Sequence, residues 1–328
     1  MPLEFIFVIV LALVFDFLNA VHGSSNIVAT MISSRAFRPW TALGITAIAE
    51  FLGPFLFGVA VAHTIGSEIV QSSVITIQML IACLVGTILW SALTWFLGIP
   101  SSPSHALIGG LMGAALVGVG PGSLHVAGVV KALAGLFSAP LIGFGIGFVL
   151  TRIIYFLVAG ASPNVNEFFK RSQLATAVAL AISHGANDAQ KAMGVIVLAL
   201  VIGGFLPGFN VPFWVILISA AGMAFGTLLA GWRLIRTIGG KFYKIRPVHS
   251  FSAQLTSTLV LLGSSLVGWP VSATQVISSA LIGVGSSERF GKVRWGVAGE
   301  ILTAWILTIP ASGLLSAGIY WLLLNIKV

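Results

Sequence analysis

The sequence predicts an all-α membrane protein that crosses the bilayer several times and consists of two repeats of inverted topology. Of its 328 residues, 58% are hydrophobic and only 7% are charged. Apolar runs of about 20 residues, long enough to cross the hydrocarbon core of a bilayer, recur from one end of the chain to the other. Segments of the first half also recur in the second half, which indicates an internal duplication.

Five apolar elements follow one another in the first half. The first, at roughly 4 to 32, lacks the basic start and the cleavage site of a secretory signal, so we expect a retained helix. The others are expected at roughly 41 to 62, 75 to 97, 102 to 119 and 126 to 150. With five equivalent elements in the second half, the chain divides into a first membrane repeat (1–160), a cytoplasmic linker (161–172) and a second, inverted repeat (173–328).

The duplication is clearest where GIPSSPSHALIGGLMG (98 to 113) aligns without a gap with GWPVSATQVISSALIG (268 to 283). The same offset also aligns a proline in the last element of each half, and a slightly different offset aligns a Thr-Ile-Gly triplet. Three matches in the same order indicate two homologous halves. The matched residues are Ser104 with Thr274, His105 with Gln275, Pro140 with Pro310, and Thr64-Ile65-Gly66 with Thr237-Ile238-Gly239.

The placement of basic residues predicts the orientation of the repeats. The loop at 33 to 40 is basic and its counterpart at 203 to 212 is not, whereas the reverse holds for 63 to 73 against 233 to 246. Equivalent loops therefore lie on opposite sides, which means that the repeats are inverted and that both termini are outside. All but three of the 16 basic residues fall in four loops, predicted to be cytoplasmic: Arg35 and Arg38; Arg152, Lys170 and Arg171; Arg233, Arg236, Lys241, Lys244 and Arg246; Arg289, Lys292 and Arg294.

This distribution explains the net charge of +8 by membrane topology, so we predict the lipid bilayer and no nucleic acid as a partner. The predicted location is the plasma membrane. The sequence leaves open whether the chain forms a homo-oligomer.

The Gly-x-Pro-x-Ser-x-Ser/Thr stretches at 98 to 104 and 268 to 274 have two interpretations. They are either surface turns between two spans or the tips of re-entrant helical hairpins. We favour hairpins, because non-helical backbone at membrane depth is tolerated where it lines a polar cavity. A proline followed by hydroxyl residues also signals a helix N-terminus, whose free N–H groups attract anions. Ordinary helix capping is the alternative.

Two stretches, FDFLNAVHGSSNIVAT (15 to 30) and HGANDAQKAMG (184 to 194), place polar and ionisable residues inside apolar runs. Spacings of three and four put most of each set on one face of a helix, which we expect to be broken as in inverted-repeat transporters. Ionisable residues inside a membrane mark ion or substrate pathways, with a buried structural ion pair as the alternative. Glu50 and Glu300 also fall within spans, where each could simply bond to backbone or to a neighbouring helix.

The residue types suit two kinds of ligand. Carboxylate, amide and hydroxyl oxygens suit a small hard cation, while free N–H groups, hydroxyls and a lysine suit an oxyanion, whose charge a bound cation offsets. The residues alone therefore predict an ion-coupled symporter of a small anion and do not separate phosphate from sulfate. The candidates for the anion are Ser102, Ser104, His105, Ser272, Thr274, Gln275 and Lys191, and those for the cation are Asp16, Asn19, His22, Asn26, Asn187 and Asp188.

HGANDAQKAMG and FDFLNAVHGSSNIVAT together resemble the paired signature of the PiT family of inorganic phosphate transporters, and the tips at 100 to 104 and 270 to 274 resemble that family's hairpins. The resemblance covers nearly the whole chain. It implies symport of phosphate with sodium, or with protons in some bacterial members, while a few relatives carry sulfate. No cofactor is implied beyond sodium as coupling ion. The family's signature residues carry over onto His22, Asn26, Asn187 and Asp188.

The chain departs from the family pattern at two positions. Gly23 stands where an aspartate often follows the histidine, and Gln254 stands where the family often has glutamate. The loss of a carboxylate puts one cation site in doubt, and Asp16, earlier on the same helix, is placed to compensate.

Two other functions fit the sequence less well. An intramembrane hydrolase built on His184 and Asp188 lacks a nucleophile motif or a metal-ligand set, so we predict that the chain is not an enzyme. A passive anion channel also needs polar residues at depth, but paired half-helices around an enclosed site suit alternating access better.

Overall fold

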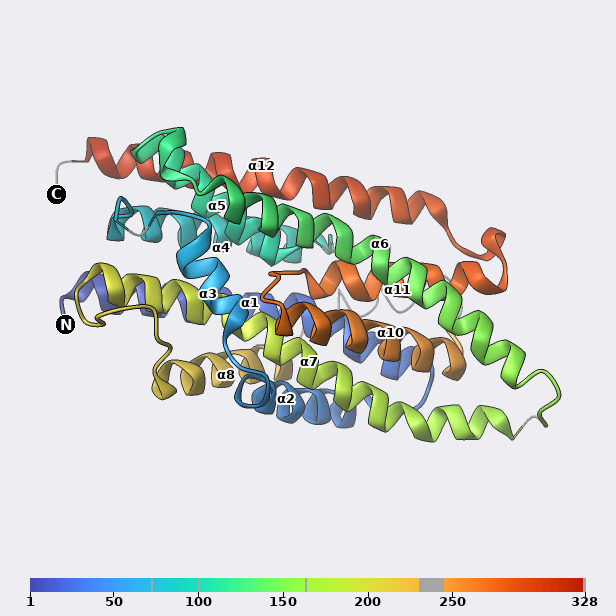
Figure 1. Ribbon diagram of the computed structural model, residues 1–328. Helices are drawn as coiled ribbons and strands as arrows, with labels where there is room; N and C mark the ends of the chain where they lie inside the picture. The colour runs from blue at the N-terminus through green and yellow to red at the C-terminus, as the bar shows by residue number, and fades with distance from the viewer. Residues whose placement is uncertain (72, 100, 163, 230–244, 327–328) are drawn as a thin grey trace.

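The protein is almost entirely helical, and its long helices run along one common direction (Figure 1). This computed structural model describes residues 1–328 except 72, 100, 163, 230–244 and 327–328. Six of the helices in the described part of the chain are long and apolar enough to cross a membrane. The predicted all-α class is confirmed, and the apolar helices that a multi-pass membrane protein needs are present.

The helices of the first half lie close to the predicted elements. The second element differs, because α2 ends at Leu56 instead of continuing to 62. Pro54 has no N–H to donate to the carbonyl of Glu50, and Gly58 adopts a positive φ of 76°, so the helix stops there. The bounds are α1 Leu3–Ser33, α2 Pro39–Leu56, α3 Ala60–His63, the π-helix η1 Thr64–Glu68, α4 Ile77–Leu97, α5 Pro103–Gly118, the 3₁₀ turn η2 Pro121–Ser123 and α6 Val126–Leu157.

In the described part of the second half, α7, α8, α10, α11 and α12 follow one another as α1, α2, α4, α5 and α6 do in the first. Residues 165–172, which we assigned to the linker 161–172, form the first turns of α7. Several residues named in the sequence analysis lie outside the described residues: Pro100, Lys327, the basic residues Arg233, Arg236, Lys241 and Lys244, and the matched triplet Thr237-Ile238-Gly239. The bounds are α7 Val165–Ile202, α8 Phe213–Leu228, α10 Pro247–Leu266, α11 Ala273–Glu288, the 3₁₀ turn η3 Phe290–Lys292 and α12 Trp295–Asn325.

The prediction that the signature helices are broken is wrong. Both signature stretches lie within uninterrupted helices, α1 and α7. Neither stretch contains a proline, and glycine keeps its backbone N–H, so the helical hydrogen bonds continue through Gly23 and Gly185. Several polar side chains bond to carbonyls of their own helix, for example Ser25 to Val21 (2.5 Å). Small and polar residues therefore do not interrupt these helices.

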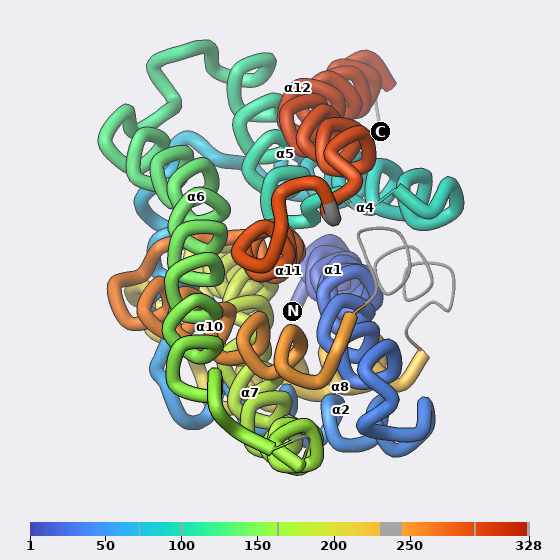
Figure 2. The backbone as a smooth tube through the Cα atoms, turned by 90° about the vertical axis from the view of Figure 1, so that its right-hand side faces the viewer, coloured from blue at the N-terminus to red at the C-terminus, as the bar shows by residue number. Residues whose placement is uncertain are grey.

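Equivalent helices of the two halves each pack against a helix of the opposite half. The helix α5 packs against α12, and its sequence equivalent α11 packs against α6. In the same way α2 packs against α7 while α8 packs against α1. In the most apolar 18-residue stretch of α7, 89% of the residues are buried, compared with 22% in that of α12. The helix α7 therefore lies at the centre of the bundle and α12 at its outside. Viewed along the bundle, α1 and α11 also lie in the middle, with α6, α12 and α2 around them (Figure 2).

The described residues of the turns before α5 and α11 make equivalent backbone hydrogen bonds. Gly98 and Gly268, which open them, adopt positive φ angles of 68° and 71°, a region that glycine enters without strain. Figure 1 shows the α4–α5 pair in one half of the long axis and the α10–α11 pair in the other, with both turns near the middle. The same backbone bonds form in each turn: Ile99 N to Thr94 O and Trp269 N to Ser264 O, both 2.9 Å, and Ala106 N to Ser102 O and Val276 N to Ser272 O, both 3.0 Å.

Both chain termini lie at the same end of the bundle (Figure 1). The connections from α1 to α2, from α6 to α7 and from α11 to α12 lie at the opposite end. The clusters Arg35/Arg38 and Arg289/Lys292/Arg294 lie at these connections, and Arg152, Lys170 and Arg171 lie in the adjoining ends of α6 and α7. The side of the membrane that each end faces remains a prediction.

Candidate functional site

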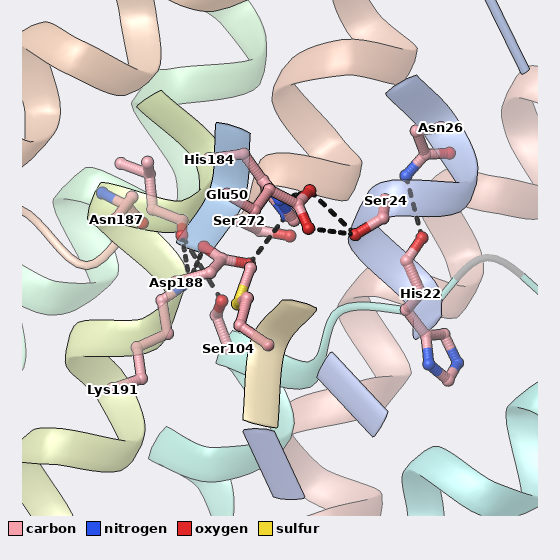
Figure 3. Close-up of polar contacts among 12 residues, drawn as sticks. His22, Ser24, Asn26, Glu50, Ser104, His184, Asn187, Asp188, Lys191 and Ser272 are labelled. Atoms are coloured by element: carbon pink, nitrogen blue, oxygen red, sulfur yellow. Dashed lines mark hydrogen bonds and ion pairs between the residues drawn. The ribbon is translucent and has the colours of Figure 1, made fainter. Parts of the chain in front are cut away.

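Signature helices and helix tips meet inside the bundle and bring the polar candidates together (Figure 3). Lys191 and Asp188 from α7, Glu50 from α2 and Ser104 and Ser272 from the two tips are at most 2% exposed. Charged and polar groups this far from water require partners, and their bonds define the site.

The centre of the site is an ion pair between Asp188 and Lys191, one turn apart on α7. The Lys191 ammonium donates to Asp188 Oδ1 and also to the backbone carbonyl of Val271, 2.9 Å away in the α11 tip. Lys191 therefore connects α7 to the turn directly before α11. Its neighbour Asn187 lies in the same cluster. In the amide orientation that satisfies both of its polar atoms, Asn187 donates to Asp188 Oδ1 (3.1 Å) and Val271 O (3.2 Å) and accepts from Ser265 Oγ (3.1 Å).

A histidine bridges two carboxylates beside this pair. His184 Nδ1 lies 2.6 Å from Glu50 Oε1, and His184 Nε2 lies 3.3 Å from Asp188 Oδ2. The two helices approach backbone to backbone here, because a side chain at Gly185 would overlap the Glu50 carbonyl. The imidazole thus links α2 to the Asp188–Lys191 pair.

Glu50 continues the network into α1 and α8. The Ser24 hydroxyl lies 2.8 and 2.9 Å from the two Glu50 oxygens, and Thr227 donates to the same carboxylate. Ser24 and Thr227 also contact each other at 2.7 Å. Glu50 is therefore a site residue that bonds to three helices, whereas Glu300 is exposed on α12.

The sequence interpretation missed most of this network. It did not decide between a site and a structural role for Glu50, and it did not include Ser24, Thr227, Ser265 or the Val271 carbonyl. Each of these five groups comes from a different element (α1, α2, α8, α10 and the turn before α11), so no spacing pattern within a helix marks them. An isolated glutamate in an apolar run is the sequence signal for Glu50.

The tip residues serve partly as helix caps. The Ser102 hydroxyl accepts from His105 N at 3.2 Å, and the Ser272 hydroxyl accepts from Gln275 N at 3.5 Å. Both serines are thus N-caps, as the capping alternative requires. A hydroxyl that accepts this bond keeps its own proton free to donate.

The two tips also contact each other. Ser104 Oγ donates to Val271 O at 3.3 Å, and Gln275 Nε2 lies 3.2 Å from His105 Nδ1. His105 and Gln275 are equivalent positions of the two halves. Thr274, which corresponds to Ser104, is 3% exposed in the first turn of α11. The candidates for the anion therefore lie in one region that also contains Lys191.

The candidates for the cation are less concentrated. Asn26 Nδ2 donates to His22 O at 3.3 Å (Figure 3). His22 Nδ1 bonds to Leu18 O at 2.9 Å, so both side chains bond to carbonyls of α1. Asp16 and Asn19 are also buried on α1. Two members of the set, Asn187 and Asp188, bond to each other, and Asn187 also bonds to Ser265 and to the Val271 carbonyl before α11.

The two departures from the family pattern have local explanations. A side chain at Gly23 would overlap the His184 imidazole, so the ring fills the space beside α1 that an aspartate would enter. Gln254 accepts from Thr176 (2.6 Å) and donates to Thr30 (2.8 Å). An amide satisfies one donor and one acceptor at once, which a carboxylate could not do without a proton.

Residues 19–316 match the phosphate transporter family, PHO4. The chain is 41% identical over 315 residues to a protein of Rhizobium meliloti (strain 1021) named "Probable low-affinity inorganic phosphate transporter", with 95% of this chain and 94% of the relative covered. A protein of the same name from Bacillus subtilis (strain 168) is 39% identical over 322 residues, with 97% and 96% covered.

A solved structure named "The sodium-dependent phosphate transporter" superposes with a TM-score of 0.91 at 23% sequence identity, covering 99% of this chain and 100% of that chain. This likeness shows a common fold. The family match spans most of the sequence and includes α1 from residue 19 onward, all of α7 and both tips. The chain belongs to the phosphate transporter family.

Proposed function

We propose that this protein imports inorganic phosphate by symport with sodium ions, through alternating access around a site near the middle of the membrane. Its family and curated relatives are transporters, so it is not an enzyme. The observation that carries the proposal is the meeting of two capped helix starts, from equivalent parts of the two halves, beside a buried lysine–aspartate pair. The solved structure of the same fold is named as sodium-dependent, which supports sodium as the coupling ion.

The two halves act as inverted repeats in this proposal, with 1–160 and 173–328 as the repeating units. The helix packing supports it, because α5 packs against α12 of the second half and its equivalent α11 packs against α6 of the first half. The turns at Gly98 and Gly268 support it too, because their φ angles agree within a few degrees, 68° and 71°. Two such tips that enter the membrane from opposite sides form re-entrant hairpins, and their helix N-termini face the same anion.

Phosphate binds between the tips in this mechanism. The donors are the hydroxyls of Ser102, Ser104, Ser272 and Thr274 and the first N–H groups of α5 and α11, with His105 and Gln275 at the contact between the tips. Ser104 donates to the Val271 carbonyl in the structure, so its hydroxyl has to turn toward the phosphate. Neutral donors hold an oxyanion and still release it.

Lys191 couples the two substrates. Its ammonium is held by Asp188 and by the Val271 carbonyl of the second tip. Sodium that binds to Asp188, with Asn187 and other oxygens nearby, competes for the carboxylate and releases the ammonium toward phosphate. The cation and the anion then bind best together, because each offsets the charge of the other in a medium of low dielectric.

The basic end of the bundle is assigned to the cytoplasm and both termini to the outside. The connections at the end away from the termini contain Arg35, Arg38, Arg289 and Arg294, and the positive-inside rule places such loops in the cytoplasm.

Uptake of labelled phosphate into proteoliposomes tests the proposal. We expect an inward sodium gradient to drive accumulation above equilibrium, with strong inhibition by arsenate and little by sulfate. A proton gradient alone should give little uptake. Uptake that follows pH and ignores sodium would favour the proton-coupled alternative, and strong competition by sulfate would favour a sulfate permease.

The same vesicles separate a transporter from a passive anion channel. A channel equilibrates phosphate along its own gradient and does not accumulate it against that gradient when only sodium is imposed. Accumulation abolished by a sodium ionophore is the expected result, while equilibration insensitive to the ionophore would contradict symport.

A further inference from the structure

Asp16 is a carboxylate that the network described above does not use. It is 0% exposed, and neither of its side-chain oxygens accepts a hydrogen bond from any of the described residues. A buried ionised carboxylate without a partner is unfavourable, so such a group holds a proton or a cation.

A second oxygen without a partner lies on the helix that packs against Asp16. Ser219 on α8 is 0% exposed, and its hydroxyl bonds to none of the described residues. Gly222 follows one turn later, and a side chain built there would lie 3.3 Å from Asp16 Oδ2. The absence of a side chain at 222 thus lets the carboxylate lie against α8, on the face that also carries Ser219.

We propose that Asp16 and Ser219 form a cation site between α1 and α8. This site is separate from Asp188 and binds sodium in the absence of phosphate. The proposal rests on sodium symport as the proposed function and names a coupling site for it. Carboxylate and hydroxyl oxygens are hard ligands of the kind that small alkali and alkaline-earth cations prefer.

The basic side chains of the network are already engaged by other carboxylates. Lys191 is held by Asp188, and the His184 imidazole contacts Glu50 and Asp188. The Asp16 carboxylate therefore adds negative charge that neither of them neutralises through a direct bond.

Sodium binding to the purified protein in detergent tests the site. Thermal stability is measured without phosphate while sodium chloride replaces choline chloride at constant ionic strength. We expect Asp16→Asn to raise the half-saturating sodium concentration about tenfold or more, and Ser219→Ala to raise it several-fold. Ser286→Ala is the matched control, because Ser286 is also buried on a helix with its hydroxyl unpartnered among the described residues, and we expect no change.

The outcomes separate this site from the proposed function. A normal sodium response in both Asp16→Asn and Ser219→Ala, with the response lost in Asp188→Asn, would overturn the Asp16 site and leave sodium symport intact. A wild-type protein that ignores sodium but is stabilised by falling pH would overturn both. Phosphate binding at saturating sodium should remain in Ser219→Ala, so a variant that loses both ligands together would also contradict a separate site.

Discussion

Asp188→Asn is expected to lower sodium-driven phosphate uptake by about tenfold or more, which corresponds to about 1.4 kcal/mol in binding or coupling. The substitution keeps the size of the side chain and removes its charge. The Asp188 carboxylate is the acceptor for Lys191 and a contact of His184, so the neutral amide leaves a buried ammonium without its counter-ion and leaves sodium without a ligand charge. Initial rates in proteoliposomes of equal protein content provide the measurement.

Glu300→Gln is the control for the loss of a carboxylate in a membrane helix. Because Glu300 is exposed on α12 whereas the site residues are buried inside the bundle, uptake should stay at the wild-type level. Normal sodium dependence in folded, correctly inserted Asp188→Asn would remove Asp188 from the coupling mechanism.

Ser104→Ala and Thr274→Val should each weaken phosphate binding by about 1 to 3 kcal/mol, the loss typical of a hydrogen bond to a charged partner. The two residues stand at equivalent positions in the first turns of α5 and α11, so the two losses should be similar. Calorimetric titration of phosphate at saturating sodium measures both affinities. Sodium binding measured without phosphate should be less affected.

Helix capping predicts a different result at the tips. Ser102 and Ser272 are the N-caps, and their replacement by alanine should cost about 0.5 to 2 kcal/mol of stability. Ser104 and Thr274 do not cap, so their variants should keep the wild-type melting temperature within a few degrees. Variants at 104 and 274 that are stable and bind phosphate normally would exclude the two-tip site.

Hydropathy and the internal repeat predicted most of the fold. A run of about 20 apolar residues has few structures open to it in a membrane except a helix, so the starts of the first-half spans were placed within two residues. The last of them, α6, continues to Leu157 instead of ending at 150. The end of α2 was misplaced, because the effect of Pro54 and Gly58 depends on where the chain turns to form α3. The signature helices were predicted to be broken on the analogy of other transporters, although their sequences contain no proline to break them.

The site was predictable where its residues are close in sequence. Asp188 and Lys191 stand out because they are charged and one turn apart in an apolar helix, and the tips stand out because they are repeated. Glu50, Ser24 and Thr227 come from three different helices, and only the packing of α2, α1 and α8 brings them together. The pairing of Lys191 with the Val271 carbonyl could not be predicted either, since a backbone atom has no signature in the sequence.

A structure determined with phosphate and sodium bound tests the central claim most directly. We expect the phosphate between the starts of α5 and α11, within hydrogen-bonding distance of the Ser104 and Thr274 hydroxyls, with the Lys191 ammonium turned toward it. Phosphate bound elsewhere in the bundle, with Ser104 still donating to the Val271 carbonyl and Lys191 still paired with Asp188, would contradict the two-tip site and the coupling through Lys191.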